Sequence, residues 1–239
     1  MKTLRLVSLL PLVACLFGTA SADEAKIRAA VSDSIGGVNI REINKTPVEG
    51  LYEVVLNGFD ILYVDGSGKY ALQGNLMELK TRTSLTAKRV EALQHIDFST
   101  LPLDRAIVKT KGNGARKLAV FSDPDCPYCQ QLERELREID NVTIYTFLLP
   151  LTEIHPDAAR KARLVWCAED KAKAWEDLML RRKEPAGKGE CDTPIEQVAG
   201  IAGKHFINGT PAMVFASGKL VPGVVPWQKL DPMLDVHGK

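Results

Sequence analysis

The residues best suited to chemistry in this chain are two cysteines, Cys126 and Cys129, separated by Pro127-Tyr128. They stand in the stretch FSDPDCPYCQQLERE, where an apolar run gives way to a helical pattern. Two thiols at this spacing serve one of three purposes: half of a zinc site, a structural disulfide, or a redox pair that exchanges disulfides. The rest of the sequence has to separate these alternatives.

The zinc and structural alternatives find little support. A zinc site needs two further ligands, commonly a second closely spaced pair. Cys167 and Cys191 lie far apart in the sequence, and the histidines occur singly, at His95, His155, His205 and His237. A disulfide inside the motif closes a loop of about four residues, worth about 2 kcal/mol in the chain-entropy estimate. The pattern favours a redox pair. We expect no metal and no cofactor, and we interpret each histidine as a surface or packing residue.

The position of the motif at a helix start explains why one of its thiols could be reactive. The first turn of a helix has free N–H groups and the positive end of the helix dipole, which stabilise a thiolate on Cys126. The dipole alone contributes about 0.3–2 kcal/mol. Since thiol pKa values of about 3.5–7.5 occur in such motifs, direct N–H···S bonds have to add to it. Cys129, one turn along, could then resolve a mixed disulfide, while Pro127 fixes the backbone where a missing N–H costs little.

The remaining pair, Cys167 and Cys191, has a different character. A bond between them closes a loop of about 25 residues and contributes about 3.5 kcal/mol in the same estimate. That loop contains the polar segment 181–189, which has little ability to order itself. We expect a structural disulfide; two buried free thiols are the alternative.

The start of the chain indicates export. Lys2 and Arg5 precede the apolar segment Leu6–Phe17 and the small-x-small pattern Ala20-Ser21-Ala22, which is typical of a secretory signal cleaved after Ala22. The alternative is a lipoprotein signal that keeps Cys15 as a lipid anchor. The whole chain has 31 basic and 30 acidic residues. This balance gives no reason to expect nucleic acid or anionic membrane as a partner, and no later apolar stretch approaches the ~20 residues of a transmembrane helix.

The elements before the motif predict a small α+β unit. Residues 23–35 have the pattern of a short amphipathic helix, and residues 38–79 form a β-meander in which Asn57-Gly58 is a strong hairpin signal. A unit of about 60 residues is marginal alone, and its edge strands need covering. Pairing with a second copy solves both problems; the alternatives are independent folding or packing on the rest of the chain. A connecting helix follows at 86–96.

The elements around the motif predict a βαβ unit with a parallel strand pair. The strands are 118–121 and 142–149, and the helix between them starts at the cysteines. A mostly helical block follows. Thr193-Pro-Ile-Glu196 has the pattern of a capping box that opens a helix. The remaining expected elements are a hairpin of strands 212–215 and 220–221, and a helical tail from Pro226.

Taken together, these motifs resemble the DsbC/DsbG family of exported protein disulfide isomerases, and DsbC more closely. The resemblance covers essentially the mature chain. It is carried by an ordered set of segments: Tyr63-Val64, Gly68-Lys69, Gln73-Gly74, Val120–Asp123, Cys126-x-Tyr128-Cys129, Trp166–Lys171, Gly209–Ala212 and Leu220–Gly223.

The resemblance implies a two-domain α/β architecture: a thioredoxin fold with a helical insertion, preceded by a small cystatin-like α+β dimerisation domain and a linker helix. The expected boundaries are 1–22 for the signal, 23–85 for the dimerisation domain, 86–102 for the linker helix and 103–239 for the catalytic domain. It also implies a periplasmic homodimer whose apolar cleft binds misfolded exported proteins, as a chaperone does, and whose thiols are kept reduced by a membrane thiol reductase of the DsbD type.

Carried onto this chain, the resemblance makes Cys126 the nucleophile, Cys129 the resolving thiol and Pro211 a cis-proline opposite the motif. Thr210, just before it, would modulate the pair and contact substrate backbone.

The dipeptide between the cysteines departs from the DsbC pattern. DsbC has Gly-Tyr there, whereas this chain has Pro127-Tyr128, the glutaredoxin dipeptide. Because the dipeptide tunes the reduction potential, the balance between isomerase and oxidase stays open. The leading hypothesis is isomerisation and reduction of wrong disulfides. The alternatives are a dithiol oxidase, a glutaredoxin-like reductase, or a chaperone with secondary redox activity.

Overall fold

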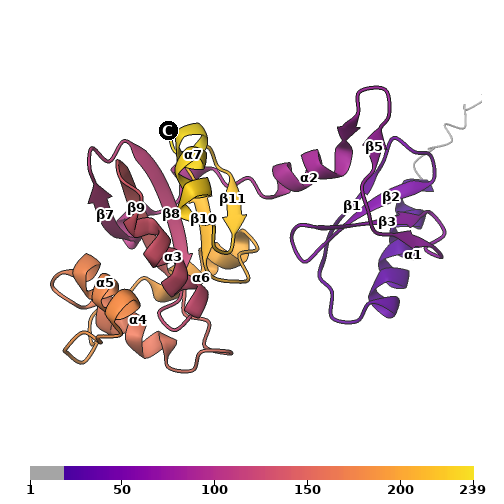
Figure 1. Cartoon of the computed structure of the whole chain (residues 1–239). Helices are drawn as coiled ribbons and strands as arrows, with labels where there is room; N and C mark the ends of the chain where they lie inside the picture. The colour runs from indigo at the N-terminus through magenta and orange to yellow at the C-terminus, as the bar shows by residue number, and fades with distance from the viewer. Residues whose placement is uncertain (1–18) are drawn as a thin grey trace, which may run out of the picture. The chain divides into compact units, whose positions relative to one another are not determined.

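The computed structural model describes residues 19–239 (Figure 1). Residues 1–18, with Cys15 and most of the predicted signal, lie outside the described residues. The chain divides into two compact units, and the boundary along the chain falls between Leu76 and Met77. No helix in the described range is long and apolar enough to cross a membrane.

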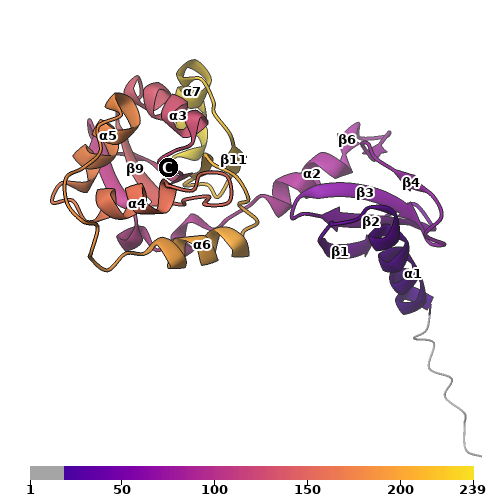
Figure 2. The ribbon, with the colours of Figure 1, turned by 90° about the horizontal axis from the view of Figure 1, so that it is seen from below.

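The first unit packs one helix against a four-stranded antiparallel sheet (Figure 2). Its elements are α1 (Thr19–Ser34), β1 (Ile40–Lys45), β2 (Leu51–Leu56), β3 (Asp60–Asp65) and β4 (Ala71–Leu72), and the strand order is β1-β2-β3-β4. Ile27 and Val31, one helical turn apart on α1, are buried against Tyr52, Val54 and Val64 of the sheet. This spacing gives the helix one apolar stripe, which the sheet covers.

The hairpin predicted at Asn57-Gly58 is confirmed. Both residues have positive φ, 51° and 99°, which is the conformation that an Asn-Gly turn supplies at low cost. The ladder resumes with Leu56 opposite Asp60, so the second strand begins one residue later than the pattern indicates. At the far side of this sheet β4 is an edge strand only two residues long.

The second unit holds the motif. Its elements before the motif are β5 (Met77–Glu78), β6 (Thr83–Ser84), α2 (Leu85–Leu93), two 3₁₀ turns (Phe98–Thr100 and Leu103–Arg105), β7 (Ile107–Lys111) and β8 (Arg116–Ser122). Those from the motif onward are α3 (Pro127–Arg137), β9 (Val142–Leu148), α4 (Ala158–Trp166), α5 (Lys171–Arg181), α6 (Ile195–Lys204), β10 (Ala212–Phe215), β11 (Leu220–Pro222) and α7 (Trp227–His237).

The strands β11-β10-β8-β9-β7 form one sheet in that order, in which β8 and β9 are parallel and the other neighbours antiparallel. The predicted βαβ unit, C-terminal hairpin and helical tail are confirmed. The strand β7 was not predicted from the sequence, because its alternating Ile107–Lys111 pattern is short and ends in a glycine turn. This strand covers the outer edge of β9.

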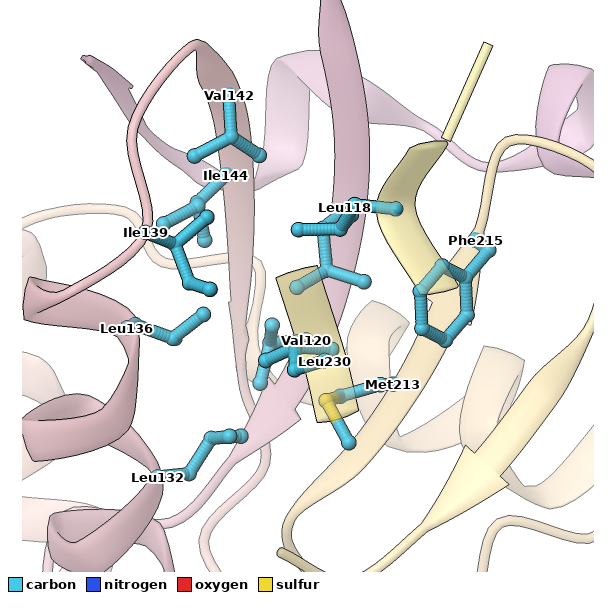
Figure 3. Packing of buried hydrophobic residues seen from close by; sticks show 11 residues of the cluster. Leu118, Val120, Leu132, Leu136, Ile139, Val142, Ile144, Met213, Phe215 and Leu230 are labelled. Atoms are coloured by element: carbon cyan, nitrogen blue, oxygen red, sulfur yellow. The ribbon is translucent and has the colours of Figure 1, made fainter. Parts of the chain in front are cut away.

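Two helices cover one face of this sheet (Figure 3). Leu132 and Leu136 project from α3, and Leu230 projects from α7, onto Leu118 and Val120 of β8. All five side chains are at most 3% exposed. The βαβ crossover therefore places the start of α3 at the carboxyl end of β8, where the motif lies.

Successive side chains on a strand face opposite ways, so Phe121 of β8 lies on the other face of the sheet, next to Phe147 of β9. The rings of Phe121 and Phe147 stack with their centroids 4.9 Å apart, and both are fully buried. They lie directly opposite each other in the parallel β8–β9 register. The carboxyl end of β8, which leads to the motif, is therefore packed on both faces of the sheet.

The helix α2 begins with a side-chain cap, and the chain just after it contacts the five-stranded sheet. Ser84 Oγ accepts a hydrogen bond from Ala87 N at 3.0 Å. Beyond the helix, Ile96 N donates to Gly218 O at 2.8 Å, and His95 forms a β-bridge with Lys219. A Cβ at Gly218 would lie 2.3 Å from the His95 ring, so this close approach requires glycine.

One local prediction is wrong. The capping box at Thr193-Pro-Ile-Glu196 does not form, because α6 begins at Ile195 and its N-cap is Pro194, with no side-chain cap. Contacts to α4 fix the entering chain instead: Cys191 is bonded to Cys167, and Asp192 O accepts from the Trp166 ring.

Replacement of Leu132 by Ala is expected to lower the free energy of unfolding of the second unit by about 2–5 kcal/mol, since Leu132 is 1% exposed between α3 and the sheet. The three tryptophans lie in this unit, so tryptophan fluorescence in a urea titration reports its unfolding. Val236→Ala is the control; Val236 is 74% exposed and the change should stay within about 0.5 kcal/mol. Equal effects of the two substitutions would contradict this account of the core.

Candidate active site

Cys126 is the N-cap residue of α3. Its backbone is extended, with φ −72° and ψ 121°, and its carbonyl accepts a hydrogen bond from Gln130 N at 3.2 Å. An N-cap side chain faces the N–H groups of the first turn, which have no partner inside the helix. Pro127 occupies the first helical position, where its missing N–H removes a donor that the helix could not have used. The local sequence therefore places the Cys126 sulfur near these backbone donors, without a capping hydrogen bond of ordinary geometry to them.

The hydrogen-bond donors around Cys126 make its thiol acidic. The pKa of Cys126 is lowered to about 5, chiefly by a hydrogen bond from the Cys129 thiol. Further lowering comes from the backbone N–H groups of Cys129 and Tyr128 and from the Thr210 side chain, while burial acts in the opposite direction. At neutral pH the sulfur of Cys126 is a thiolate.

Cys129 has the opposite character. It is fully buried, and its sulfur accepts a hydrogen bond from Asp123 N at 3.4 Å. Burial raises the pKa of the Cys129 thiol far above its ordinary value, and the hydrogen bond to Cys126 raises it further. Cys129 therefore holds its proton and shares it with Cys126. Both residues are free cysteines here, so the motif is in its dithiol form.

The loop before β10 closes the other side of the thiolate. The Thr210–Pro211 peptide bond is cis. In its protonated form Cys126 donates a hydrogen bond from its thiol to Thr210 O at 3.3 Å, and this contact joins two segments far apart in the sequence. The Thr210 side-chain oxygen is buried, has no hydrogen bond of ordinary geometry within residues 19–239, and lowers the pKa of both thiols. Gly223 N holds the loop by donating to Pro211 O at 2.8 Å.

A buried carboxylate that the sequence analysis missed organises the turn before the motif. Asp123 is fully buried, and its side chain accepts from Asp125 N at 2.7 Å and from Leu151 N at 2.6 Å. His155 Nδ1 lies 3.0 Å from the same carboxylate. Asp123 thus ties the loop after β9 to the turn, while its own N–H contacts Cys129. The residue belongs to a segment that carries the family resemblance, but its partner in the later loop gives no local signal.

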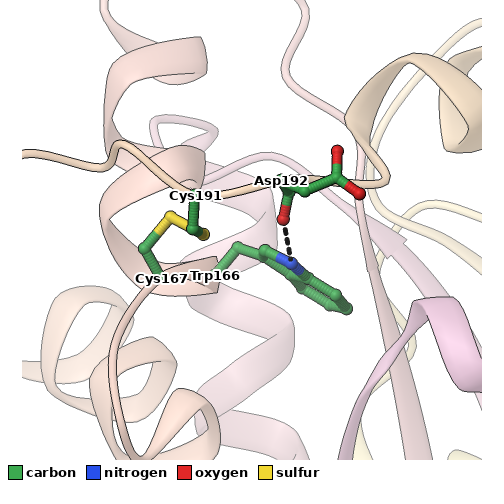
Figure 4. The surroundings of a disulfide bond; sticks show 4 residues. All are labelled: Trp166, Cys167, Cys191 and Asp192. Carbon is green, nitrogen blue, oxygen red and sulfur yellow. Dashed lines mark hydrogen bonds between the residues drawn. A yellow bond between two sulfur atoms is a disulfide. The ribbon is translucent and has the colours of Figure 1, made fainter.

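The second cysteine pair forms a disulfide beside Trp166 (Figure 4). Cys167 and Cys191 form a disulfide with their Cα atoms 5.7 Å apart, which joins the end of α4 to the segment before α6. Trp166 Nε1 donates to Asp192 O at 3.1 Å beside it, and Lys171 Nζ lies 4.1 Å from the Trp166 ring centroid. This bond fastens the helical insertion rather than taking part in the redox site.

The insertion is also fastened to the active-site helix. Trp175 Nε1 on α5 donates to Glu133 Oε1 on α3 at 2.7 Å, and burial raises the pKa of that carboxyl. Trp175, Leu178 and Cys129 belong to one buried cluster. The insertion therefore forms part of the dry environment that keeps Cys129 protonated.

The structure brings Cys126, Cys129, Thr210 and Pro211 together and places Tyr128 beside them at 64% exposure. Across residues 19–239, no group of three or more His, Cys, Asp and Glu side chains is placed to hold a metal ion. The arrangement combines a thiolate, which can attack a disulfide, with a neighbouring protonated thiol, which can resolve a mixed disulfide. These are the two groups that disulfide exchange requires.

Comparisons with known proteins agree with this geometry. Residues 18–87 match the disulfide bond isomerase protein N-terminal domain, and residues 103–237 match the thioredoxin-like domain. The chain is 41% identical to the probable thiol:disulfide interchange protein DsbC of Bordetella parapertussis over 89% of this chain and 74% of that protein. It is 30% identical to the thiol:disulfide interchange protein DsbC of Salmonella typhimurium over 95% of this chain and 94% of that protein.

A solved structure gives the same result. The crystal structure of the disulfide interchange protein from Neisseria gonorrhoeae is 42% identical in sequence to this chain and matches it with a TM-score of 0.56. The match covers 58% of this chain and 99% of the Neisseria chain. The resemblance noted in the sequence is confirmed, and so is the fold class of a thioredoxin fold preceded by a smaller N-terminal domain. The chain belongs to the DsbC family of thiol:disulfide interchange proteins.

Proposed function

We propose that this chain isomerises and reduces incorrect disulfides in exported proteins, with Cys126 as the nucleophile and Cys129 as the resolving thiol. The observation that carries the proposal is the division of character within one helical turn: Cys126 is ionised at neutral pH, and Cys129 is buried and protonated. Only one sulfur can attack, so the order of events is fixed.

The reaction begins when the Cys126 thiolate attacks one sulfur of a substrate disulfide. A mixed disulfide forms, and the other substrate sulfur leaves as a thiolate. In isomerisation a different substrate thiolate attacks the mixed disulfide, a new substrate disulfide forms, and Cys126 leaves as a thiolate again, with no net change in oxidation state. Stabilisation of the Cys126 thiolate makes it a good leaving group in this step.

Reduction is the competing outcome. Cys129 loses its proton and attacks the Cys126 sulfur, so the substrate leaves with two electrons and the Cys126–Cys129 disulfide remains. The enzyme then needs two electrons from outside, and we propose a membrane thiol reductase of the DsbD type as their source. The Cys129 pKa, raised by burial, slows this escape and leaves time for rearrangement.

Four neighbouring residues complete the proposed site. Thr210 and Pro211 would present backbone to a substrate chain beside the thiolate, and the Thr210 side chain would modulate both thiols. Pro127 fixes the turn, and the exposed Tyr128 ring offers an apolar contact. No cofactor enters the cycle.

The proposed organisation assigns each part of the chain a task. Residues 1–22 would be a signal for export to the periplasm, 23–85 the dimerisation domain, 86–102 the linker helix and 103–239 the catalytic domain. Support for a homodimer comes from the match to the isomerase N-terminal domain and from β4, a short edge strand on which Leu72 is 61% exposed. Two catalytic domains facing one another would provide the apolar cleft for unfolded substrates.

One observation favours a second candidate, a dithiol oxidase. A pKa of about 5 at Cys126 stabilises the dithiol form, which makes the disulfide form an effective oxidant. The presence of Pro127-Tyr128 in place of the usual DsbC dipeptide also leaves open the balance between isomerase and oxidase activity. The assays below separate the two candidates, and also a chaperone with secondary redox activity.

The alkylation rate of reduced Cys126 is expected to rise with pH to a midpoint near 5 and then level off, because the thiolate is the reactive form. At pH 6 it should exceed that of free cysteine, whose pKa is about 8.5. Cys129→Ala should move the midpoint upward, since it removes the largest stabilising contact. Iodoacetamide with mass spectrometry measures both. A thiol protonated at neutral pH, alkylating no faster than free cysteine, would overturn the mechanism.

Recovery of active ribonuclease from its scrambled form is expected for the wild type and lost in Cys126→Ser, which lacks the attacking sulfur. Cys129→Ala should accumulate mixed disulfides, because resolution is blocked. Rapid oxidation of a reduced substrate without recovery of the scrambled one would favour the oxidase. Suppression of aggregation should persist in Cys126→Ser, since it needs the binding surface and not the thiols.

Light scattering of the mature protein is expected to give a dimer. Leu72→Asp, which places a charge on the β4 edge, should shift the protein toward monomer, whereas Val48→Asp in the β1–β2 turn should not. Both side chains are exposed, so neither change disrupts the core. A monomeric wild-type protein would contradict the dimer and favour the oxidase.

A further inference from the structure

Two acidic residues precede the reactive cysteine, which is unfavourable for a thiolate. Asp123 and Asp125 stand three residues and one residue before Cys126. A nearby negative charge disfavours a second one and would raise the pKa of the thiol. Asp123 is compensated by its three hydrogen bonds from the turn and the loop after β9. Asp125 needs a different partner.

That partner is Lys161, in the first half of α4. Lys161 Nζ lies 2.6 Å from Asp125 Oδ1, and the two side chains are 19% and 20% exposed. A pair this sheltered is screened less by water and salt than a surface pair. The contact to Asp125 is the largest of the influences that raise the pKa of Lys161, so the ammonium stays charged throughout the working pH range.

The charged groups around the pair keep Lys161 in place. Asp157 lies 3.4 Å from Lys161 Nζ, but it also binds Arg160, which in turn binds Glu184 on the outer side. On the inner side, His155 faces Asp123 rather than Asp125. Lys161 is therefore the cation that faces Asp125 among the described residues. Asp123 also holds the loop before α4, through its contacts to Leu151 N and His155 Nδ1.

We propose that Lys161 is a positioning residue for the reactive thiol: it neutralises the Asp125 carboxylate and thereby sets the reduction potential of the Cys126–Cys129 pair. The helical insertion would then have a chemical task besides its structural one. This inference rests on the proposed role of Cys126 as the nucleophile. It concerns a residue outside the motif and the cis-proline loop.

The sign of the effect follows from the redox equilibrium. The Cys126–Cys129 disulfide and two glutathione thiols exchange two electrons to give the dithiol and one glutathione disulfide. Without Lys161, the Asp125 charge acts on the Cys126 thiolate, the dithiol becomes less stable, and the potential falls. Without the Asp125 charge, Lys161 acts on the thiolate alone, and the potential rises.

The test is a double-mutant cycle on the full-length protein with Lys161→Met and Asp125→Asn. Lys161→Met should raise the Cys126 pKa by about 0.5–1 unit, a three- to tenfold change in the equilibrium, and lower the potential by about 15–30 mV. Asp125→Asn should shift both quantities the other way. In the Asp125→Asn background, Lys161→Met should have a much smaller effect. Lys161→Arg should restore values close to the wild type, since it keeps the charge.

Lys229→Met is the matched control, because Lys229 is exposed on α7 and its loss changes the net charge equally. The proposal is overturned if Lys161→Met leaves the pKa and the potential unchanged, or shifts them equally in both backgrounds. If Lys161→Met does not fold, Asp125→Asn alone decides, and an unchanged potential overturns the proposal. A wild-type Cys126 without an acidic pKa would instead remove the proposed function itself.

Discussion

A negative charge on a nearly buried sulfur is costly unless donors surround it. In this protein the Cys129 thiol, the first turn of α3 and the Thr210 side chain supply those donors to Cys126. These donors come from the start of α3 and from the loop before β10, so the site requires the βαβ crossover and the packing of β10 beside β8. The two-faced packing of β8 gives the turn a rigid base. The reactivity of one atom thus depends on the whole catalytic unit.

The asymmetry between the two sulfurs has the same origin. Cys126 ends an extended segment and faces the free N–H groups, whereas Cys129 lies inside the helix and faces the core formed with the insertion. One turn of helix therefore separates a polar environment from an apolar one. This separation follows from the place where a strand ends and a helix begins.

Much of this could be predicted from the sequence, because the signals are local. The Asn57-Gly58 turn, the strand–helix–strand pattern around the motif and the helical tail depend on neighbouring residues, and the structure contains them. The capping box at Thr193 failed because tertiary contacts of Cys191 and Asp192 override a local preference. The partners of the acidic residues before the motif could not be predicted either. Nothing near His155 or Lys161 in the sequence indicates a partner, and only the fold brings them to Asp123 and Asp125.

The bridge between His95 and Lys219 has a consequence for movement. Because Gln94–Ile96 is hydrogen-bonded to the β10–β11 turn, the chain just after α2 is attached to the five-stranded sheet. Pulling this segment away from the sheet would break two backbone hydrogen bonds at the sheet edge. Because position 218 has no side chain, the His95 ring can lie close enough to the turn for these bonds to form.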